Sequence, residues 1–539
     1  MEITPFYTLP ALFHATLSRN GDRPSVAMVG SRPITYSELD QNIRSGISQL
    51  VGMNIAPGDR VGILSTNMPQ WAIAFYSITF MGAVAVPLLP DFHPSEIAAI
   101  IKHSGSKMIF ASEGLMAKLS DLDPAEVRSV PIESFPNLEQ DERVSSSFHF
   151  PVVEEDLAAI IYTSGTTGKS KGVMLTHRNI AFCAVKSGTV QTITPDDRFL
   201  SILPLSHTYE NTIGLILPMA SGACVYYLGK PPTPGLLLPA LQLVRPTIML
   251  SVPLIIEKIF RNSVLAKFTK SRVLRIIYKI PYFRKKLHLI AGIKLKKTFG
   301  GKLRFFGVGG AKLHKTVEKF LIEARFPYAV GYGLTESAPL LAGFNPSNYR
   351  LQSTGTPMEG VTLKIHNPDR VTGEGEIWAK GMNVMKGYYN EPELTQEILT
   401  PDGWLKTGDL GVFDKDGYLY IKGRIKNMIV MSGGENIYPE EIEAVINDFN
   451  HVLESLVIEQ KGKLVALVYF NVDEIEQQYQ HLKHEVSNYV DARLNELQRE
   501  LQEYVNSRVN KFSQVQMIVP QPEPFQKTPT LKIKRFLYT

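Results

Sequence analysis

Ten consecutive residues, 163–172, combine glycine, hydroxyl and lysine side chains in a pattern suited to an anion. Glycines let backbone N–H groups approach an anion closely, hydroxyl groups add short donors, and lysines supply positive charge. The apolar residues 158–162 predict a strand leading into this loop. The composition predicts a loop that holds the phosphates of a nucleotide, with these candidate residues: Thr163, Ser164, Gly165, Thr166, Thr167, Gly168, Lys169 and Lys171.

Two other interpretations of this loop are less favoured. A Walker A loop needs a glycine five positions before the Gly of Gly-Lys-Ser, but Thr163 stands at that distance from Gly168, so the Walker pattern fails. A polar run of Ser, Thr and Gly is more often a flexible linker. Strand-like apolar runs bracket the loop closely, and this favours a binding loop over a linker.

Two more predicted strands, 303–308 and 329–334, end in glycine-rich turns. Glycines and a tyrosine at strand ends offer a flat slot for a purine ring, and Glu336 is placed where a divalent cation would bridge it to phosphate. Each signal is weak alone, because a glycine after a strand usually marks only a turn. The candidates here are Gly309, Gly310, Ala311, Tyr332, Gly333, Thr335 and Glu336.

The elements that must position these groups follow an alternating pattern. Residues 36–51 have a helical apolar face, 60–64 read as a strand, another helix starts at Pro69, and strand-like runs recur after the loop. This alternation of helices and strands predicts an α/β fold with mainly parallel sheets that are covered on both faces by helices. Short strands after Gly355 predict a small β subdomain, and the mixed pattern after residue 426 predicts a small α+β C-terminal domain.

Length and composition set the broad class. A chain of 539 residues is too long for one core, and 44% apolar with 20% charged residues is typical of a globular protein. Two cysteines, Cys183 and Cys224, make no disulfide framework and have no metal-ligand spacing, which favours a reducing cytoplasm. The N-terminus lacks the features of a signal peptide.

Residues 71–90 contain no charged residue and have about the length of a membrane span. Gly82, Pro87 and Pro90 interrupt the run, and its second half is rich in valine. We therefore expect a buried helix, a glycine break and a buried strand instead of a span.

Residues 258–302 hold fourteen basic residues and no Asp or Glu, interleaved with aromatic and aliphatic residues. Such a stretch suits an anionic membrane surface, where basic groups meet lipid headgroups and apolar groups sink slightly inward. A solvated basic face is the simpler alternative. Nucleic acid is the least favoured, since no nucleic-acid motif accompanies the charge. We expect peripheral membrane contact here, on the inner face of the membrane.

Together the motifs resemble those of the adenylate-forming superfamily, which comprises acyl- and aryl-CoA synthetases, luciferases and adenylation domains. The resemblance covers nearly the whole chain, and the six motifs stand in the family's order. They are YTSGTTGKSKGVMLTH at 162–177, LPLSHTYE at 203–210, GYGLTES at 331–337, KTGD at 406–409, GRIKNMIVMSGGENIYPEEIE at 423–443 and PTLKIKR at 529–535.

The resemblance implies a role for each matching residue. Residues 163–171 would hold the β- and γ-phosphates of ATP, residues 309–311 with Tyr332 would enclose adenine, and Thr335 and Glu336 would meet the α-phosphate and Mg²⁺, with Thr163 as a second metal contact. Asp409 would bond the ribose hydroxyls with help from Arg424. His207 would lie near the substrate carboxylate. A turn-capping Asp, a surface Arg and a core or surface His are the plain alternatives.

Lys532 would assist the first half-reaction, in which a carboxylate attacks the α-phosphate, because a positioned ammonium offsets the growing charge. The family's usual residue before this lysine is Gly, whereas here it is Leu531, a form similar to that of long-chain acyl-CoA synthetases. The resemblance also implies a hinge at Lys426, about which the small domain turns to bring Gly433 and Gly434 to the pantetheine arm of CoA.

These motifs imply domains at 1–423 and 427–539, joined by a hinge at 424–426. The expected activity is ATP-dependent activation of a fatty acid to acyl-AMP, followed by transfer to CoA. Two alternatives stay open at this point. One is an acyl-AMP ligase or acyl-carrier-protein synthetase, which differs only in the acceptor; the other is a nucleotide-binding scaffold without catalysis. Acyl chain length cannot be read from the sequence.

Overall fold

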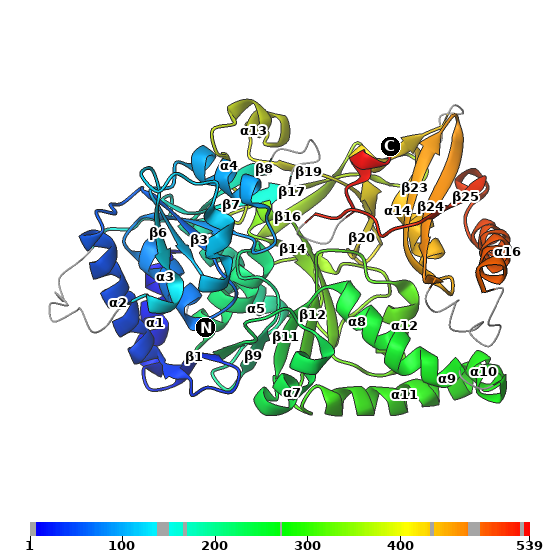
Figure 1. Cartoon of the computed structure of the whole chain (residues 1–539), viewed down its shortest axis with the longest axis horizontal. Coiled ribbons are helices and arrows are strands. Elements are labelled where there is room, and N and C mark those ends of the chain that lie inside the picture. The colour runs from blue at the N-terminus through cyan, green and yellow to red at the C-terminus, as the bar shows by residue number, and fades with distance from the viewer. Residues whose placement is uncertain are drawn as a thin grey trace.

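The computed structural model describes residues 7–136, 150–164, 170–269, 272–431, 436–472, 486–528 and 533–539. Two large sheets with their helices lie side by side, a smaller antiparallel sheet lies above them in the view of Figure 1, and the C-terminal elements lie to one side. This is the α/β class that the alternating pattern predicted.

The first sheet has seven strands in the order β18-β8-β7-β4-β3-β5-β6. Its interior pairs from β7 to β6 are parallel, and β8 and β18 are antiparallel additions at one edge. The strands are β3 (Arg60–Leu64), β4 (Val84–Leu88), β5 (Met108–Ala111), β6 (Arg128–Pro131), β7 (Leu157–Ser164), β8 (Ser170–Thr176) and β18 (Gly387–Tyr388).

Helices cover this sheet on both faces, as expected. Ala85 of β4 packs in one hydrophobic cluster with α3, while its neighbours Val84 and Val86 pack in another with Ile97 of α4. Successive side chains of a strand point to opposite faces, so each face has its own core. The helices of this half are α1 (Leu9–Asn20), α2 (Tyr36–Gly52), α3 (Pro69–Phe80), α4 (Pro94–Ser104) and α5 (His177–Val190).

The uncharged run at 71–90 forms the buried helix α3 and the buried strand β4, separated by Gly82, as the sequence predicted. Gly82 has φ +77°, a conformation that favours glycine. Among the described residues, no helix is long and apolar enough to cross a membrane.

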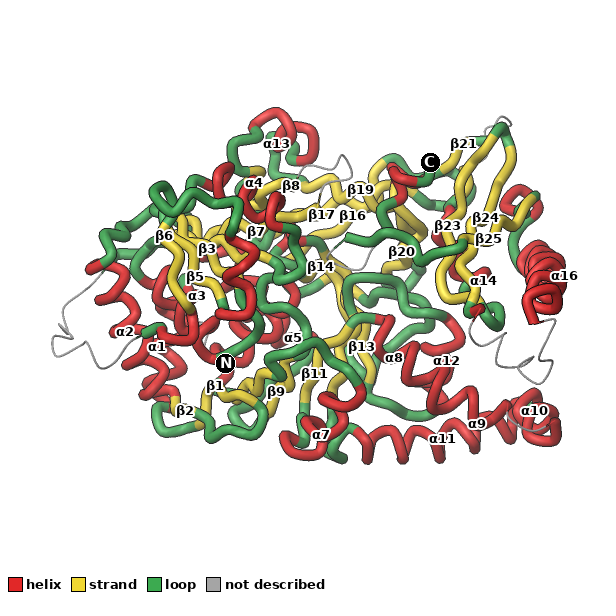
Figure 2. Tube along the Cα trace, viewed as in Figure 1, coloured by secondary structure: helices red, strands yellow, loops and turns green. Residues whose placement is uncertain are grey.

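The second sheet has nine strands in the order β15-β14-β13-β12-β11-β9-β10-β1-β2, with parallel pairing from β13 to β1. Figure 2 shows its strands between the helices. The strands are β1 (Pro24–Met28), β2 (Ile34–Thr35), β9 (Arg198–Ser201), β10 (Cys224–Tyr227), β11 (Ile248–Ser251), β12 (Phe305–Val308), β13 (Tyr328–Gly333), β14 (Leu340–Gly343) and β15 (Thr356–Pro357).

The basic stretch forms part of the helices beside this sheet. Helices α9, α10 and α11 run along the lower edge of the molecule in Figure 1, with α7 at the far end of that edge. The helical elements here are the π-helix η4 (Tyr209–Ile216), α6 (Leu217–Ser221), α7 (Pro234–Val244), α8 (Pro253–Ile259), the π-helix η5 (Phe260–Leu265), α9 (Ala266–Thr269), α10 (Arg272–Lys279), α11 (Pro281–Thr298) and α12 (Lys315–Glu323).

A four-stranded antiparallel sheet, β16-β17-β19-β20, forms the predicted small β subdomain. Its last two strands carry Asp409 and Arg424, which are partners in the ladder. The elements are β16 (Val361–His366), β17 (Gly375–Gly381), α13 (Pro392–Ile398), β19 (Leu405–Phe413) and β20 (Leu419–Arg424).

The C-terminal elements have a hydrophobic cluster of their own, built by residues such as Ile442, Leu464 and Leu501. A separate core is what an independent domain needs, and the hinge at 424–426 stays a prediction. The elements are the 3₁₀ turn η7 (Ile425–Asn427), β21 (Ile429–Val430), β22 (Asn436–Ile437), α14 (Pro439–Ile446), β23 (Val452–Gln460), β24 (Lys463–Phe470), α16 (Val486–Asn506) and β25 (Met517–Gln521).

Candidate active site

The predicted phosphate loop lies at the tip of a β-hairpin. β7 and β8 pair antiparallel, with Thr163 opposite Lys171 and Ser164 opposite Ser170. The predicted strand into the loop is confirmed, and the chain returns as a second strand. Residues 165–169, which include the predicted Gly165, Thr166, Thr167, Gly168 and Lys169, lie outside the described residues.

One tyrosine joins this hairpin to the predicted metal carboxylate. Tyr388 of β18 pairs with Val173 of β8, and its ring centroid lies 5.2 Å from Lys171 Nζ. Its hydroxyl donates a 2.8 Å hydrogen bond to Glu336 Oε1. Burial and the nearby Glu336 carboxylate raise the pKa of Tyr388, so the hydroxyl stays protonated and donating. The structure thus brings Lys171 and Glu336 to the same side chain.

A second cluster surrounds the predicted ribose ligand. Asp409 is buried, its Oδ1 lies 2.9 Å from Arg424 Nε, and its Oδ2 accepts a 2.8 Å hydrogen bond from the Tyr332 hydroxyl. Burial and the Asp409 charge hold the pKa of Tyr332 well above its usual value, so it remains a donor. The Asp409 carboxylate is thus held from two sides, by Arg424 and by Tyr332.

Arg424 electrostatically links the two clusters. The Asp409 carboxylate raises the pKa of Arg424 most, against the opposing effect of burial, and Glu336 adds to the rise. The Arg424 side chain is 44% exposed, while that of Asp409 is 6% exposed. The guanidinium is therefore partly open to solvent and to a ligand. The structure brings Asp409, Arg424, Tyr332 and Glu336 into one region, and their roles stay predictions.

The glycines at the strand ends are required by close packing. A Cβ on Gly333 would lie 1.8 Å from the Pro339 carbonyl oxygen, and one on Gly309 would lie 3.2 Å from ring atoms of Tyr209. Gly310 has φ +84° with little around it, so its backbone is open on that side. An open glycine backbone lets a ligand approach closely, and adenine binding by the turn at 309–311 stays a prediction.

His207 stands just before the π-helix η4. Its Nδ1 accepts a 3.2 Å hydrogen bond from the Tyr209 backbone N–H. One turn further, Glu210 is fully buried, and burial raises its pKa to about 8. Its Oε2 atom has no hydrogen-bond partner among the described residues. π-Helical turns occur frequently at functional sites, and this one carries the predicted His207 at its start.

An apolar cavity lies between α5, η4 and strands β11–β13. Its open volume is about 50 Å³. Because one water takes up about 30 Å³ of liquid, the cavity as it stands admits only a few methylene groups. The residues that line the cavity include Gln191, Ile193, Phe199, Tyr209, Ile248, Leu250, Phe305, Gly307 and Gly331. Tyr209 lines the cavity and also packs against Gly309, so one ring borders both the cavity and the nucleotide turn.

The remaining predicted residues divide into two groups. Thr335 opens the 3₁₀ turn η6 (Thr335–Ser337) beside Glu336, and Lys426 is exposed in η7. Lys532, Gly433 and Gly434 lie outside the described residues. Sequence reasoning missed Tyr388 and Tyr209. Tyr209 stands inside the LPLSHTYE motif, and that position was the signal for it; Tyr388 has no comparable signal, since only the fold brings it to Glu336.

Among the described residues, no three His, Cys, Asp or Glu side chains gather closely enough to hold a metal ion by themselves. Mg²⁺ usually binds through one or two carboxylates together with substrate phosphates. A single carboxylate, Glu336, beside a phosphate loop fits that ion.

A family model described as "AMP-binding enzyme" matches residues 13–389. The chain belongs to the AMP-binding enzyme family. This match confirms the resemblance to adenylate-forming enzymes that the six motifs indicated. Glu336 and the glycine turns lie within the matched residues, whereas Asp409 lies beyond them. The fold class is the predicted one.

Known proteins similar to this AMP-binding enzyme cover almost all of it. It is 30% identical over 564 residues to long chain acyl-CoA synthetase 7, peroxisomal, of Arabidopsis thaliana, covering 93% of this chain and 79% of that protein. It is 28% identical to long-chain-fatty-acid–CoA ligase 1 of Homo sapiens, with the same coverage. The crystal structure of ATP-bound MatB from Rhodopseudomonas palustris has the same fold, with a TM-score of 0.78, 22% identity, and 99% and 98% of the two chains covered.

Proposed function

We propose that this AMP-binding enzyme is an ATP-dependent fatty-acid CoA ligase that first makes acyl-AMP with release of pyrophosphate and then transfers the acyl group to CoA. One observation carries the proposal: an apolar cavity ends at the glycine strand ends beside the Asp409 and Glu336 clusters. Gly307 and Gly331 line it; Tyr332 directly follows Gly331, and Gly309 stands two residues after Gly307. An apolar acyl group and a nucleotide would therefore meet at these strand ends.

The nucleotide would be held from three sides. Asp409 and Arg424 are placed for the ribose, the turn at 309–311 for the adenine, and the β7–β8 hairpin with Lys171 for the phosphates. Mg²⁺ would be held by Glu336 and phosphate oxygens, with Thr163 as a further candidate, and when bound it would neutralise phosphate charge. Tyr388 fixes the Glu336 carboxylate from the side of the hairpin.

The acid would place its chain in the cavity and its carboxylate near His207. The lining is almost wholly apolar, which suits an alkyl chain. Relatives named as long-chain enzymes support a long-chain acid, but the open volume requires side chains such as Tyr209 to move before a long chain enters. Lys532 is the proposed cation for the first half-reaction. A rotation of the C-terminal domain about Lys426 would then allow the second half-reaction, the transfer to CoA.

An acid panel tests this function. We expect pyrophosphate release from ATP that requires a fatty acid, and acyl-CoA formation only when CoA is added. Release without any acyl-CoA would favour the acyl-AMP ligase or carrier-protein synthetase, which can be tested with an acyl-carrier protein as acceptor. Absence of acid-dependent release with every acid would contradict the proposal and favour a non-catalytic nucleotide-binding protein.

We also propose peripheral contact with an anionic membrane through the helices of the basic stretch. Along α10 and α11 eight large apolar side chains are exposed, and α7 adds three leucines. The α10–α11 side chains are Val273, Ile276, Ile280, Tyr282, Phe283, Leu289, Ile290 and Ile293. Exposed apolar side chains gathered in this way are typical of an interaction surface.

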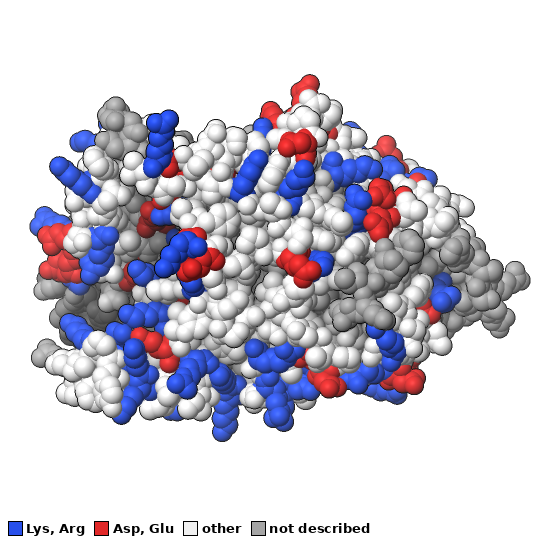
Figure 3. Space-filling view, turned by 180° about the vertical axis from the view of Figure 1, so that it is seen from behind, with Lys and Arg blue, Asp and Glu red and all other residues white. Residues whose placement is uncertain are grey.

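Basic residues share this surface. Lys286 lies 4.5 Å from the centroid of the Tyr282 ring, and Lys and Arg side chains gather along the lower edge in Figure 3. Lys285, Lys286, Lys294 and Lys297 form no ion pair with a described carboxylate. By contrast, Arg284 on the inner side bonds Glu323 of α12, with Nη2 3.0 Å from Oε1. The inner face anchors the helix, and the outer face keeps free charge for lipid headgroups.

Liposome co-sedimentation tests the membrane contact. We expect binding to vesicles containing an anionic phospholipid, loss of binding in high salt, and weaker binding when Lys285, Lys286, Lys294 and Lys297 are changed to Gln. The matched control changes Lys461 and Lys463, which are exposed on the C-terminal hairpin, to Gln. Binding that does not depend on lipid charge, on salt or on the α11 substitutions would contradict the membrane proposal. That result would have no bearing on the proposed ligase activity.

A further inference from the structure

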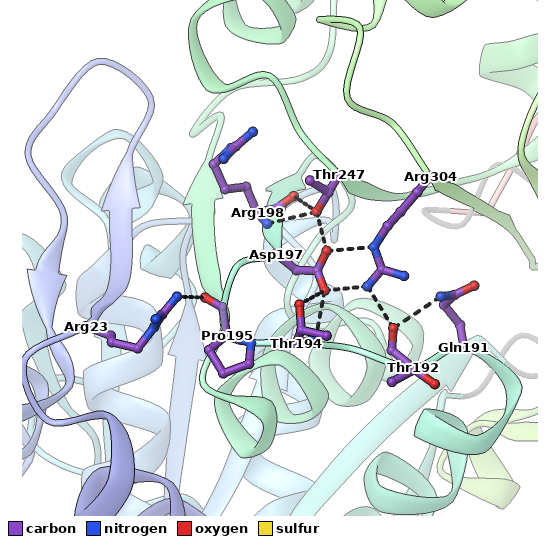
Figure 4. A network of polar contacts seen from close by, with 9 residues as sticks. All are labelled: Arg23, Gln191, Thr192, Thr194, Pro195, Asp197, Arg198, Thr247 and Arg304. Carbon is purple, nitrogen blue, oxygen red and sulfur yellow. Dashed lines mark hydrogen bonds and ion pairs between the residues drawn. The ribbon is translucent and has the colours of Figure 1, made fainter.

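An ion pair with a buried carboxylate and a partly exposed arginine lies at one end of the second sheet. Asp197 is 3% exposed, and its Oδ1 accepts hydrogen bonds from Arg304 Nε at 2.8 Å and from Thr247 Oγ1 at 2.7 Å. Its Oδ2 accepts from a second Arg304 nitrogen and from the Thr194 backbone N–H at 2.7 Å. Figure 4 shows these contacts around the carboxylate. Every oxygen of Asp197 is thus occupied.

The carboxylate is charged in the folded protein. Burial acts to raise the pKa of Asp197, but hydrogen bonds from Arg304, Thr247 and Thr194 outweigh it and the pKa is lowered. The result is a fixed, fully hydrogen-bonded carboxylate inside the protein, whose partner Arg304 reaches it from the surface.

This pair lies directly beneath the apolar cavity. Arg198, Thr247 and Arg304 stand at or just before the amino ends of β9, β11 and β12. Their immediate neighbours in the chain, Phe199, Ile248 and Phe305, line the cavity. Ile193 lines it as well, between the network residues Thr192 and Thr194, and so does Gln191, whose amide donates to the Thr192 carbonyl.

The opposite end of the cavity is the reactive end. Leu250 and Gly307 line the cavity near the carboxyl ends of β11 and β12, next to the nucleotide turn. Each strand has four residues, so three steps of about 3.3 Å separate its ends, roughly 10 Å. An extended alkyl chain advances about 1.3 Å per carbon, since its single bonds are about 1.5 Å long and meet at tetrahedral angles. A segment of about eight carbons therefore spans the distance between the two ends once the lining side chains have moved aside.

We infer that the Asp197–Arg304 ion pair is the floor of the acyl pocket and limits the length of the acyl chain that this enzyme accepts. The inference rests on the proposed ligase function. A longer chain would have to push its methyl end through a hydrogen-bonded charge pair. Displacing Asp197 would break the hydrogen bonds that its buried oxygens accept from Arg304, Thr247 and Thr194, whereas each additional buried methylene improves binding only about fourfold. One or two extra methylenes do not offset that loss.

The test compares kcat/KM for acyl-CoA formation over straight-chain acids from medium to very long. We expect the wild type to lose efficiency beyond the length that reaches the floor. The double substitution Asp197→Ala with Arg304→Ala removes both charges together, so that neither is stranded. The double variant should raise the ratio of kcat/KM for longer acids to kcat/KM for shorter acids by about tenfold or more. Each methylene that becomes buried should raise kcat/KM about fourfold.

The matched control is Arg23→Ala. Arg23 bonds the outer side of the same turn, through the Pro195 carbonyl oxygen and Asp196 Oδ1, both at 2.6 Å, and Arg23 does not line the cavity. We expect its acid profile to match the wild type. An unchanged profile in the double variant, with a cooperative melting transition, would overturn the inference.

A second variant covers the case in which the double variant does not fold. Ile193→Phe adds volume just above the ion pair without touching a charge, and it should shorten the longest accepted acid by about two carbons or more at ~1.3 Å each. If Ile193→Phe left the profile unchanged, the acyl chain would not reach the floor and the inference would fail. Absence of acid-dependent pyrophosphate release in the wild type is a different result, since it contradicts the ligase function itself.

Discussion

Arg424 Nε lies 2.9 Å from Asp409 Oδ1, and the two residues are direct partners across strands β19 and β20. Tyr332 holds the other carboxylate oxygen from a different sheet. A buried carboxylate fixed on two sides cannot rotate freely, so its oxygens point in defined directions. We therefore expect Asp409 to present a fixed carboxylate to a ligand.

Asp409→Asn should weaken ATP binding. The change replaces a charged acceptor by an amide, and a hydrogen bond to a charged group is worth about 1.5–3 kcal/mol, which predicts a rise of roughly tenfold to a hundredfold in the KM for ATP. Steady-state kinetics at saturating acid measures it. The control is Arg350→Ala, which breaks a surface pair with Asp414 at the other end of the same strands. Equal KM values for the Asn variant and wild type would contradict the assignment.

Glu336→Gln should raise the Mg²⁺ concentration needed for half-maximal activity, because the neutral amide is a weaker ligand for a hard cation. Tyr388→Phe removes the 2.8 Å hydrogen bond that positions Glu336, and we expect a smaller shift in the same direction, about threefold to tenfold, as for one hydrogen bond of about 0.5–1.5 kcal/mol. A Mg²⁺ titration of pyrophosphate release measures both. A Phe variant that shifted the Mg²⁺ requirement more than the Gln variant would argue against a positioning role for Tyr388.

Lys532→Ala should slow acyl-AMP formation by about a hundredfold or more, the usual effect of removing a group that stabilises developing charge. Thioester formation from added acyl-AMP and CoA should keep a rate near that of the wild type, since that step does not need this cation. Single-turnover kinetics of each half-reaction separates the two. Equal losses in both steps would mean that Lys532 supports the fold or CoA binding instead.

Glu210→Gln should change the pH dependence of stability. The folded pKa of Glu210 is about 8 against an ordinary 4.5, so between these values the folded protein holds a proton that the unfolded chain has lost. The contribution of Glu210 to the free energy of unfolding is therefore largest at low pH. It falls as pH rises, by at most about 1.4 kcal/mol per pH unit. Melting temperatures from about pH 5 to 8 should fall more steeply in the wild type than in the Gln variant. The control is Glu155→Gln at a mostly exposed carboxylate; parallel curves for all three proteins would refute the prediction.

Local patterns in the sequence predicted most of the fold. The apolar period of residues 36–51 corresponds to α2, and the valine-rich end of the uncharged run corresponds to β4. The sheet order could not be predicted, because hydrogen bonding between distant strands, such as β10 with β1, depends on packing across the whole domain. The mixed pattern after residue 426 corresponds to the helices α14 and α16 and the strands β23 to β25.

The site residues also divide into those that the sequence motifs reveal and those that only the fold brings together. Asp409, Glu336 and the strand-end glycines stand in short motifs and could be found from the sequence. Tyr388 could not, because it lies 52 residues from Glu336 and only the antiparallel addition of β18 to β8 brings it there. Asp197 and Arg304 are 107 residues apart, and each alone reads as an ordinary charged residue near a strand. Contacts of this kind are created by the tertiary fold.

Tyr209 borders both the apolar cavity and the nucleotide turn, with its ring 3.2 Å from where a Cβ on Gly309 would be. Any acid that displaces this ring alters the wall against which the base would lie. The two ligands should therefore influence one another's affinity, and by thermodynamic reciprocity the factor must be the same in either order of addition. Because one aromatic ring borders both sites, the size of the bound acid should change the affinity of this enzyme for the nucleotide.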